Sequence, residues 1–337
     1  MNKTIADMAQ RAMEGWRLGR DDLLALADLS RSELHDLLYW AWQVRLARFG
    51  RRVRLCCIIA GKLGGCGENC KWCAQPATIA AKPQYATTGQ ILQTAQAARD
   101  RHAAGIGIVN SGRRPNQAEL QTVIDAAGEI RRLHGQAVYV CASLGELTPD
   151  QATRLAAAGV QRYNHNLESS RRFYPNVVGS HSYDDRLATL ATARGAGMKL
   201  CCGGIFGLGE TWADRVDLAM TLRDEVGPEI VPLNFLHPIA GTPMEDVAPL
   251  APTEILVIIA VFRLAMPDVD LKIAGGRECN LRGLQSWIFH AGATSIITGG
   301  YLTTPGQGSD ADLQMIQDLG LEIVSDLSGK APGNAEG

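Results

Sequence analysis

Three cysteines stand close together, with the spacing Cys-x3-Cys-x2-Cys: Cys66, Cys70 and Cys73. The aromatic Trp72 precedes the last of them. Soft thiolates at such short intervals can converge on one face of an iron–sulfur cube, and three ligands on a four-iron cluster leave one iron free to hold another group. The alternatives are a zinc knuckle and three buried thiols. Zinc sites usually pair Cys-x2-Cys units with a fourth ligand, and this triplet has no such partner nearby, so the pattern favours a redox cluster.

The triplet with its aromatic neighbour resembles the signature of radical S-adenosylmethionine (SAM) enzymes. The resemblance implies a [4Fe-4S] cluster whose open iron is chelated by the amine and carboxylate of SAM. In that family an electron from the cluster cleaves SAM to methionine and a 5′-deoxyadenosyl radical. A second string resembles the motif that packs against the SAM adenine, through Gly203, Ile205, Gly207 and Glu210. The alternative for this string is an ordinary strand-to-helix turn, with Glu210 near a helix start.

The composition indicates the size class of the protein and the cellular compartment in which we expect it. The 337 residues are 46% hydrophobic and 20% charged, which is globular composition, and the length suits one α/β barrel. A formal charge of −2 gives no basic surface for nucleic acid or an anionic membrane, and the apolar run 254–266 is too short to span a bilayer. Nine cysteines without an apolar N-terminal run indicate reduced thiols, so we expect a cytoplasmic protein.

The elements that must position these residues alternate along the chain. Residues 1–50 read as a helical extension, with helices over 6–18, 21–27 and 31–49. Eight apolar runs are expected strands: 53–59, 107–110, 137–143, 160–166, 198–206, 230–236, 269–275 and 294–298. Helical patterns lie near 88–103, 117–133, 148–158, 183–196, 211–225, 252–266, 281–291 and 310–319. The alternation predicts parallel βα units closed into a (β/α)8 TIM-type barrel over 51–325, followed by a disordered tail over 326–337.

A doubly wound open sheet is the alternative architecture, but no Gly-x-Gly-x-x-Gly follows the first strand. Active sites of (β/α)8 barrels gather at the C-terminal ends of the strands. The cysteine triplet follows the first strand. Other chemically capable residues fall on later strands or just past them: Cys141, Asn164, Asn166, Glu168, Cys201, Asn234 and Arg277. The barrel prediction therefore brings them to one mouth.

Longer strings carry a closer resemblance. They are residues 163–168, 201–211, 231–234, 241–243, 274–277 and 302–305. In this order and spacing they are similar to the biotin synthases, from about residue 50 to residue 325. The resemblance implies a homodimeric sulfurtransferase that uses two SAM-derived radicals to insert sulfur between C6 and C9 of dethiobiotin. The sulfur would come from an auxiliary iron–sulfur cluster, and the electrons from flavodoxin or ferredoxin.

The same resemblance implies binding roles. Asn166 and Glu168 would bond the SAM ribose, and Asn166 would also meet the ureido ring of dethiobiotin. Asn234 would take the other side of that ring, because an amide offers both a donor and an acceptor to a urea. Thr303 and Thr304 would meet the substrate carboxylate. Taken alone, either asparagine is a turn or strand-end residue.

The auxiliary cluster departs from the familiar family pattern, in which three cysteines and one arginine hold a [2Fe-2S] cluster. Cys141 and Cys201 match two of those cysteines, and Arg277 matches the arginine. Asn110 stands where the remaining cysteine is expected, and asparagine is a poor iron ligand beside thiolates. The chain resembles a second branch of the family, in which a larger cluster is expected. Our hypothesis is that Cys56, Cys141 and Cys201 hold this cluster with Arg277 near it; the alternative makes Cys56 a core residue.

Two other functions remain open. The first is another radical SAM enzyme of the same barrel, inserting sulfur elsewhere or maturing a cofactor. The second belongs to a different class, a non-catalytic iron–sulfur carrier or sensor. The paired asparagines favour a ureido substrate. The carrier hypothesis does not explain why the chain has a string that resembles a SAM-binding motif.

Overall fold

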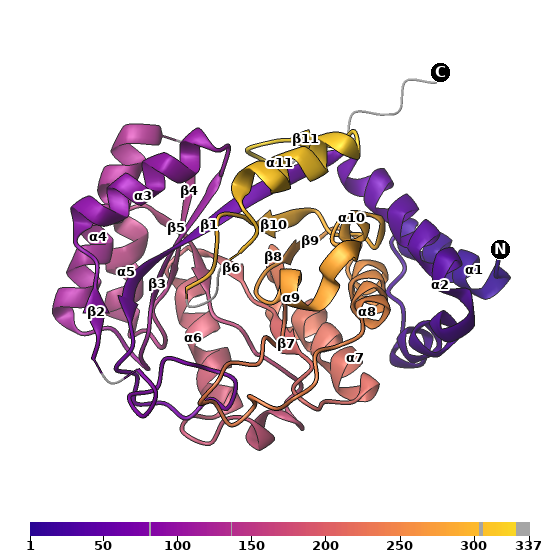
Figure 1. Cartoon of the computed structure of the whole chain (residues 1–337), viewed down its shortest axis with the longest axis horizontal. Coiled ribbons are helices and arrows are strands. Elements are labelled where there is room, and N and C mark those ends of the chain that lie inside the picture. Colours follow the sequence, from indigo (N-terminus) through magenta and orange to yellow (C-terminus); the bar gives the residue numbers. More distant parts are fainter. Residues whose placement is uncertain (81, 136, 303–305, 328–337) are drawn as a thin grey trace.

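The computed structural model describes residues 1–80, 82–135, 137–302 and 306–327, and for Arg31 the backbone alone. It shows a closed barrel of eight parallel strand positions with helices around it (Figure 1). In barrel order the strands are β1 (Arg52–Leu63), β3 (Gly105–Asn110), β4 (Tyr139–Ser143), β5 (Val160–Asn164), β6 (Lys199–Cys201) with β7 (Gly204–Phe206), β8 (Ile230–Phe235), β9 (Asp270–Ile273) and β10 (Ser295–Ile297). The barrel closes where β10 pairs with β1, at Ser295 opposite Arg54. The predicted (β/α)8 fold is confirmed.

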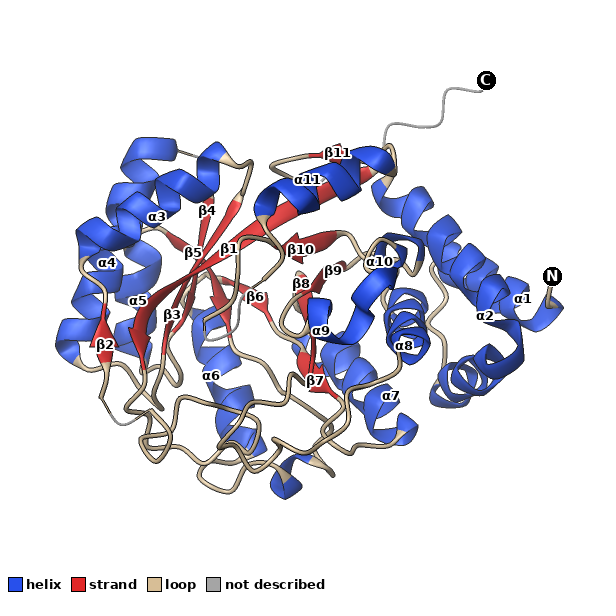
Figure 2. Ribbon diagram, in the orientation of Figure 1, coloured by secondary structure: helices blue, strands red, loops and turns tan. Residues whose placement is uncertain are grey.

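Helices cover the outside of the strands (Figure 2). They are α3 (Thr88–Asp100), α4 (Gln117–His134), α5 (Pro149–Ala157), α6 (Tyr183–Gly195), α7 (Trp212–Thr221), α8 (Pro252–Ala265), α9 (Arg277–Leu281), α10 (Trp287–His290) and α11 (Ser309–Asp318). Short strands β2 (Gln84–Tyr85) and β11 (Glu322–Ile323) pair with the two ends of β1. Most helices begin at the positions that their sequence patterns predict.

The structure differs from the predicted elements at two places. The single strand expected over 198–206 is divided into β6 and β7. Between them the Cys202 N–H bonds the Ile230 carbonyl, and Gly203 lies so close to β8 that an added Cβ would stand 1.9 Å from the Pro232 oxygen. The two helices expected over 21–27 and 31–49 form one helix, α2 (Arg20–Phe49), which is kinked at Glu33.

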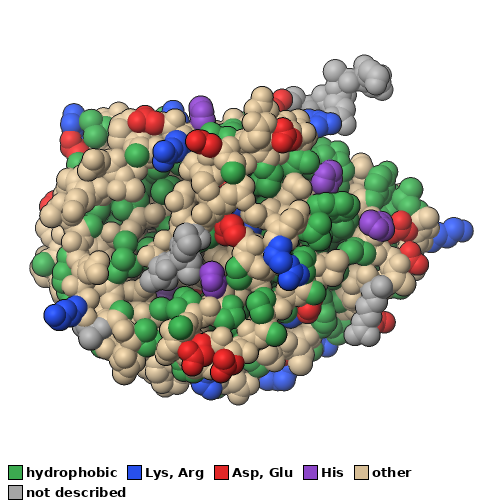
Figure 3. Space-filling view, viewed as in Figure 1, with side chains coloured by type: hydrophobic (Ala, Val, Ile, Leu, Met, Phe, Trp, Pro, Cys, Tyr) green, Lys and Arg blue, Asp and Glu red, His purple; other side chains and the backbone are tan. Residues whose placement is uncertain are grey.

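The N-terminal helices lie beside the barrel (Figure 1). Helix α1 (Lys3–Met13) packs on α2, and α2 packs on α7 and α8. In the part of the chain that the structure describes, no helix is long and apolar enough to cross a membrane. Basic side chains are scattered over the face in Figure 3 rather than gathered in a patch. Most of the tail expected over 326–337 lies outside the described residues, since these end at residue 327.

Candidate active site

The loop after β1 carries the cysteine triplet and folds back on itself. The Gly64 N–H donates to the Gln75 side-chain oxygen at 2.6 Å. Two backbone hydrogen bonds join Cys66 to the end of the loop. The Cys66 N–H donates to the Gln75 carbonyl, and the Cys66 carbonyl accepts the Ala77 N–H. The Gln75 N–H also donates to the Cys73 sulfur at 3.4 Å. The turn therefore holds the three thiols at one rim of the barrel mouth.

These thiols fit an iron–sulfur cluster. Burial raises the pKa of Cys70 to about 12 and that of Cys73 to about 11, and charge on Cys66 raises both further. The three sulfurs therefore lie within electrostatic reach of one another in a half-buried site, where bound iron would hold them as thiolates. Among the described residues, no three His, Cys, Asp or Glu side chains are grouped around the position of a single metal ion. A cube needs a wider arrangement, because each thiolate binds a different iron.

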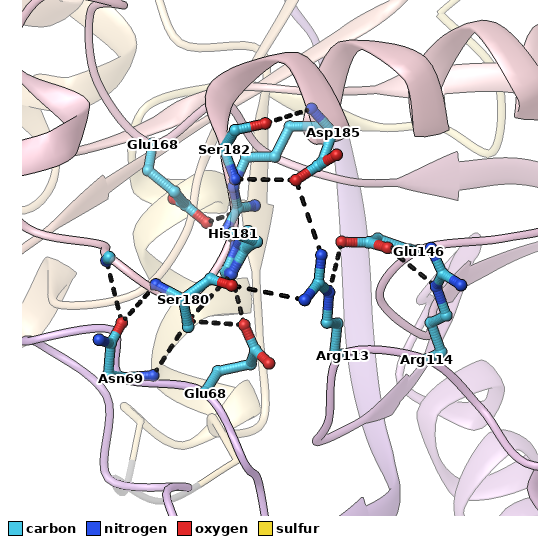
Figure 4. Close-up of polar contacts among 12 residues, drawn as sticks. Glu68, Asn69, Arg113, Arg114, Glu146, Glu168, Ser180, His181, Ser182 and Asp185 are labelled. Atoms are coloured by element: carbon cyan, nitrogen blue, oxygen red, sulfur yellow. Dashed lines mark hydrogen bonds and ion pairs between the residues drawn. The ribbon is translucent and has the colours of Figure 1, made fainter.

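A second segment clamps the cluster loop from outside (Figure 4). The Asn69 side-chain oxygen accepts the backbone N–H groups of Gly179 and Ser180, both at 3.0 Å. The Lys71 N–H donates to the Val177 carbonyl at 3.1 Å. The loop between Cys66 and Cys73 is thus fixed to the segment that leads into α6.

A chain of polar contacts continues from this clamp to the mouth. Glu68 lies 2.5 Å from Nδ1 of His181, whose Nε2 is 2.9 Å from the Arg186 guanidinium (Figure 4). Since arginine can only donate, Nε2 accepts and Nδ1–H donates to Glu68. Burial first, and then Arg186, lowers the pKa of His181, which favours this neutral form. Arg186 also donates to the Asn166 carbonyl at 2.7 Å and lies 3.6 Å from the Glu168 carboxylate.

Arg186 is a site residue that sequence reasoning missed. Ser182 caps α6 by accepting the Asp185 N–H, which puts Arg186 in the first turn of the helix and aims it at the mouth. No spacing rule identifies such a residue, because its partners lie on other elements.

Glu168 is held in an unusual conformation. Its φ is 69°. Its backbone N–H donates to the Gly203 carbonyl, and its own carbonyl accepts the Ile205 N–H. Burial raises the pKa of its carboxyl, which Arg186 opposes, and one carboxylate oxygen has no protein partner. Backbone strain at a buried, half-satisfied carboxylate is typical of a ligand site.

A cavity of about 310 Å³ lies at this mouth, beneath the cluster loop. Its lining includes Trp72, Cys73, Glu168, Ile205 and Tyr301. The cavity therefore connects the triplet with the segment predicted to bind SAM.

The four residues of the string predicted to pack against adenine make different contacts. Ile205 lines the mouth cavity, whereas the Glu210 carboxylate accepts the N–H groups of Gly207 and Leu208 at 3.0 and 2.8 Å. Glu210 also pairs with Arg215 at 2.8 Å. Its observed contacts are therefore those of the turn, and they shape the wall that Ile205 presents to the cavity.

Asn166 and Asn234 line both the mouth cavity and a deeper one of about 180 Å³ inside the barrel. The Asn166 side-chain oxygen accepts the Gly203 N–H at 3.2 Å. Asn234 bridges Gly204 and Gly275, at 3.1 and 2.9 Å. These bonds fix the orientation of both amides at the boundary between the cavities. Thr303 and Thr304, which we predicted to meet a carboxylate, lie outside the described residues.

Cys56, Cys141 and Cys201 pack together in one buried cluster, and Cys56 and Cys141 of this cluster line the deeper cavity. Cys141 and Cys201 share a hydrogen bond. The Cys56 sulfur lies 2.9 Å from the Tyr139 hydroxyl. Cys56 thus faces the interior, as the alternation of side chains on β1 predicts.

Cys201 and Cys141 have pKa values that are shifted in opposite directions. The hydrogen bond from Cys141 and the positive charge of Lys272 outweigh burial and lower the pKa of Cys201 to about 5. Lys272 lies 3.4 Å and the Asn164 amide nitrogen 3.3 Å from its sulfur. Conversely, the same hydrogen bond and burial raise the pKa of Cys141 well above its usual range. The cavity stabilises a thiolate, the form that binds iron.

The structure corrects the position of Arg277. Arg277 is fully buried, but it bonds Asp312 at 2.8 Å and Glu278 at 3.0 Å, away from the three thiols. It begins α9 after β9 has ended at Ile273, whereas Lys272 lies on β9 and faces the cavity. The basic side chain beside the thiols is therefore Lys272, because strand register decides which residue turns inward.

Asn110 faces away from the thiols. On β3 the inward positions are Gly105, Gly107 and Val109, whereas Asn110 lines a separate cavity against α4. Its side-chain oxygen stands 2.4 Å from where Gly61 would carry a Cβ. In this fold a cysteine at position 110 would point toward α4, away from the deeper cavity.

Comparison with known proteins identifies both halves of the chain. The sequence model of the radical SAM superfamily matches residues 62–222, and that of the Biotin and Thiamin Synthesis associated domain matches residues 232–322. A biotin synthase of Geotalea daltonii is 41% identical over 96% of this chain and 99% of its own length. One of Trichlorobacter lovleyi is 43% identical over 96% of this chain and 97% of its own length. A biotin synthase of Geobacillus kaustophilus is 43% identical over 94% of this chain and 95% of its own length.

Solved structures share the fold at lower identity. Methylornithine synthase superposes with a TM-score of 0.81 at 19% identity, covering 94% of this chain and 97% of that protein. The hydrogenase maturase HydG gives 0.82 at 16% identity, covering 96% of this chain and 76% of that protein. At these identities the likeness concerns the barrel alone.

Proposed function

The chain belongs to the biotin synthase family of radical SAM enzymes, and we propose that it is a sulfurtransferase that converts dethiobiotin to biotin. The observation that carries the proposal is the arrangement of two cysteine triplets along one barrel. One triplet rims the mouth, the other lies in the interior, and a cavity walled by two oriented amides separates them. A non-catalytic iron–sulfur carrier has no use for such a chamber.

The residues at hand could hold both iron–sulfur groups. Cys66, Cys70 and Cys73 would hold a [4Fe-4S] cluster, and the interior thiols a second cluster of two or more irons. When bound, the first cluster with SAM supplies a hydrogen-abstracting radical, and the second supplies sulfur. The protein contributes position and seclusion.

Residues of the mouth would hold SAM. Glu168 has an unpaired carboxylate oxygen in the mouth cavity, which suits the hydroxyl groups of a ribose. Arg186 fixes that carboxylate and joins it to the clamp on the cluster loop. Ile205 gives an apolar wall for the adenine, and Gly203, Gly207 and Glu210 shape that wall.

Dethiobiotin would lie between the two cavities. Asn166 and Asn234 line both, so a ureido ring held by their amides would present its neighbouring carbons to SAM on one side and to the interior thiols on the other. We infer that Thr303 and Thr304 receive its carboxylate, by resemblance to the family.

The interior group would be held by Cys56, Cys141 and Cys201, with Lys272 beside it. Lys272 is buried and points at Cys201, so its charge would offset that of thiolates and bridging sulfides. Lys272 thus takes the place beside the thiols that the family resemblance assigns to Arg277.

Family resemblance further supports a homodimer that receives electrons from flavodoxin or ferredoxin. All nine cysteines are free thiols in the structure, which agrees with a reducing cytoplasm as the working compartment.

A matched pair of variants tests the proposal, because Cys56 and Cys57 are neighbours on β1 and Cys56 alone joins the interior group of thiols. We expect anaerobically purified enzyme to show two distinct clusters by Mössbauer spectroscopy and to yield biotin in a single turnover with SAM and dethiobiotin. Cys56→Ser should lose the interior cluster and biotin formation, while Cys57→Ser keeps both.

Three other outcomes would count against the proposal. SAM cleavage without biotin would move the protein to another radical SAM reaction. Absence of SAM cleavage under strong reductant would favour an iron–sulfur carrier. Full retention of interior iron in Cys56→Ser would remove Cys56 from the ligand set.

A further inference from the structure

A third cavity opens at the opposite end of the barrel, where the strands begin. It measures about 510 Å³ and is lined by residues of the strand starts and of the C-terminal segment, including Arg54, Tyr139, Arg162, Lys199, Asp270 and Leu327. The Tyr139 side chain lines both this cavity and the interior one that holds the three thiols. We refer to the third cavity as the basal cavity.

Tyr139 forms the partition between the two spaces. Its hydroxyl lies 2.9 Å from the Cys56 sulfur. Its ring stacks against two guanidinium groups, with the carbon of Arg162 at 3.7 Å and that of Arg54 at 4.9 Å from the ring centre. The opposing position is Gly105, where a Cβ would stand 2.3 Å from the hydroxyl, so only glycine leaves room for the ring at this point.

The inner end of the basal cavity is positively charged. Barrel interiors of this kind are normally filled by branched apolar side chains. Here Arg54 pairs with Asp270, whereas Arg162 and Lys272 have no carboxylate within ion-pair distance in the described part of the chain.

The outer rim is mixed in charge. Lys199 is exposed there beside Glu229, Asp268 and Asp326. Asp268 is paired with Arg48 at 3.1 Å, and the Glu229 carboxylate accepts the Leu200 N–H. The rim therefore carries both signs of charge, whereas Arg162, against the Tyr139 ring, has no carboxylate within ion-pair distance among the described residues.

We propose that the basal cavity is the entry site for a small inorganic sulfur anion, hydrosulfide, which replaces the sulfide that the interior cluster has given up. The sulfur binds the irons at the oxidation state in which they were left, and its proton passes to solvent through the basal cavity, so this step transfers no electrons. This inference rests on the proposed function. A loaded enzyme has its mouth filled by the first cluster, SAM and dethiobiotin, and the basal cavity reaches the same thiols from the other side. Lys199 and Arg162 attract the anion, because like-signed charges along a narrow low-dielectric path focus the field, and Tyr139 admits it.

The test follows cluster rebuilding in enzyme that has completed one turnover. Ferrous and ferric iron in equal amounts are added anaerobically with sodium sulfide, so that a cluster can assemble without an external oxidant, and the interior signal is followed by Mössbauer spectroscopy. Lys199→Glu reverses an exposed charge at the rim, and Lys3→Glu makes the same change on the exposed side of α1 as the matched control. Arg162→Met removes the inner charge while keeping most of the volume.

We expect rebuilding to slow at least about threefold in Lys199→Glu and Arg162→Met, and less at high salt, with Lys3→Glu as fast as wild type. The mouth cluster of each variant gives up no sulfur in the turnover, so its signal should stay unchanged and serves as an internal control. Equal interior rates in all four proteins would overturn the entry site alone. A wild-type enzyme with no interior cluster would instead overturn the proposed function, and this inference with it.

Discussion

The clamp on the cluster loop gives the sharpest test of how this fold holds its iron. Asn69→Ala removes an oxygen that accepts two backbone N–H groups, from Gly179 and Ser180, both at 3.0 Å. A hydrogen bond of this kind contributes about 0.5–1.5 kcal/mol net, so the pair contributes about 1–3 kcal/mol. Gly179 is exposed and water can replace part of the loss, which puts the expected cost in the lower half of this range, at about 1–2 kcal/mol.

That cost should appear as loop opening rather than as global unfolding. A change of about 1–2 kcal/mol raises the population of the open loop by about 5- to 30-fold. Release of iron from the mouth cluster to an anaerobic chelator should accelerate by the same factor, and SAM affinity should fall. The control is Lys71→Ala in the same loop, because Lys71 contacts Val177 through its backbone N–H, which the substitution preserves.

The outcome that refutes this reasoning is equal iron release from Asn69→Ala, Lys71→Ala and wild type. It would mean that the loop is held by its own turn around Gln75 and that the segment before α6 adds nothing.

Three further predictions concern the interior, the barrel wall and pH. Lys272→Met should change the spectrum of the interior cluster, whereas Arg277→Lys should leave it unchanged and lower only the melting temperature. Gly203→Ala should lower the free energy of unfolding by at least about 1–3 kcal/mol in urea, because its Cβ would stand 1.9 Å from the Pro232 oxygen; unchanged stability would contradict this. Burial lowers the pKa of His181 from 6.5, so its neutral form contributes stability that is present above pH 6.5 and lost as pH falls through the folded pKa; His181→Gln should flatten that decline in unfolding free energy.

The alternation of strands and helices is predictable because it depends on local patterns. Short apolar runs and helical periodicity recur along the chain, and each expected strand appears within a few residues of its place. The division between β6 and β7 depends instead on a contact between residues that are far apart in the sequence. It arises from the closeness of Gly203 to a carbonyl on β8, about thirty residues later in the chain, and no window around residue 203 contains that information.

The site shows the same distinction. The cysteine triplet is identifiable from spacing alone, since its ligands lie within one loop. Choosing between Lys272 and Arg277 requires the end of β9 to within two residues, and the sequence pattern predicts that end at residue 275, whereas the strand ends at Ile273. Arg186 could not be found from spacing, because its role comes from partners in the loop after β5 and in the loop before α6.

The charged side chains inside the barrel explain why the interior thiols lie directly above them. A buried cation without a carboxylate partner costs about 3–5 kcal/mol, and this barrel carries the buried Lys272, with the half-buried Arg162 on β5, where related folds carry apolar side chains. The cost is offset when an anionic group lies above them, and the three interior thiols stand at that level. An iron–sulfur cluster on those thiols would therefore stabilise the barrel as well as supply its chemistry. The protein without its interior cluster should accordingly be less stable than the loaded enzyme, and part of that difference should disappear in Lys272→Met, which removes the cation that the cluster compensates.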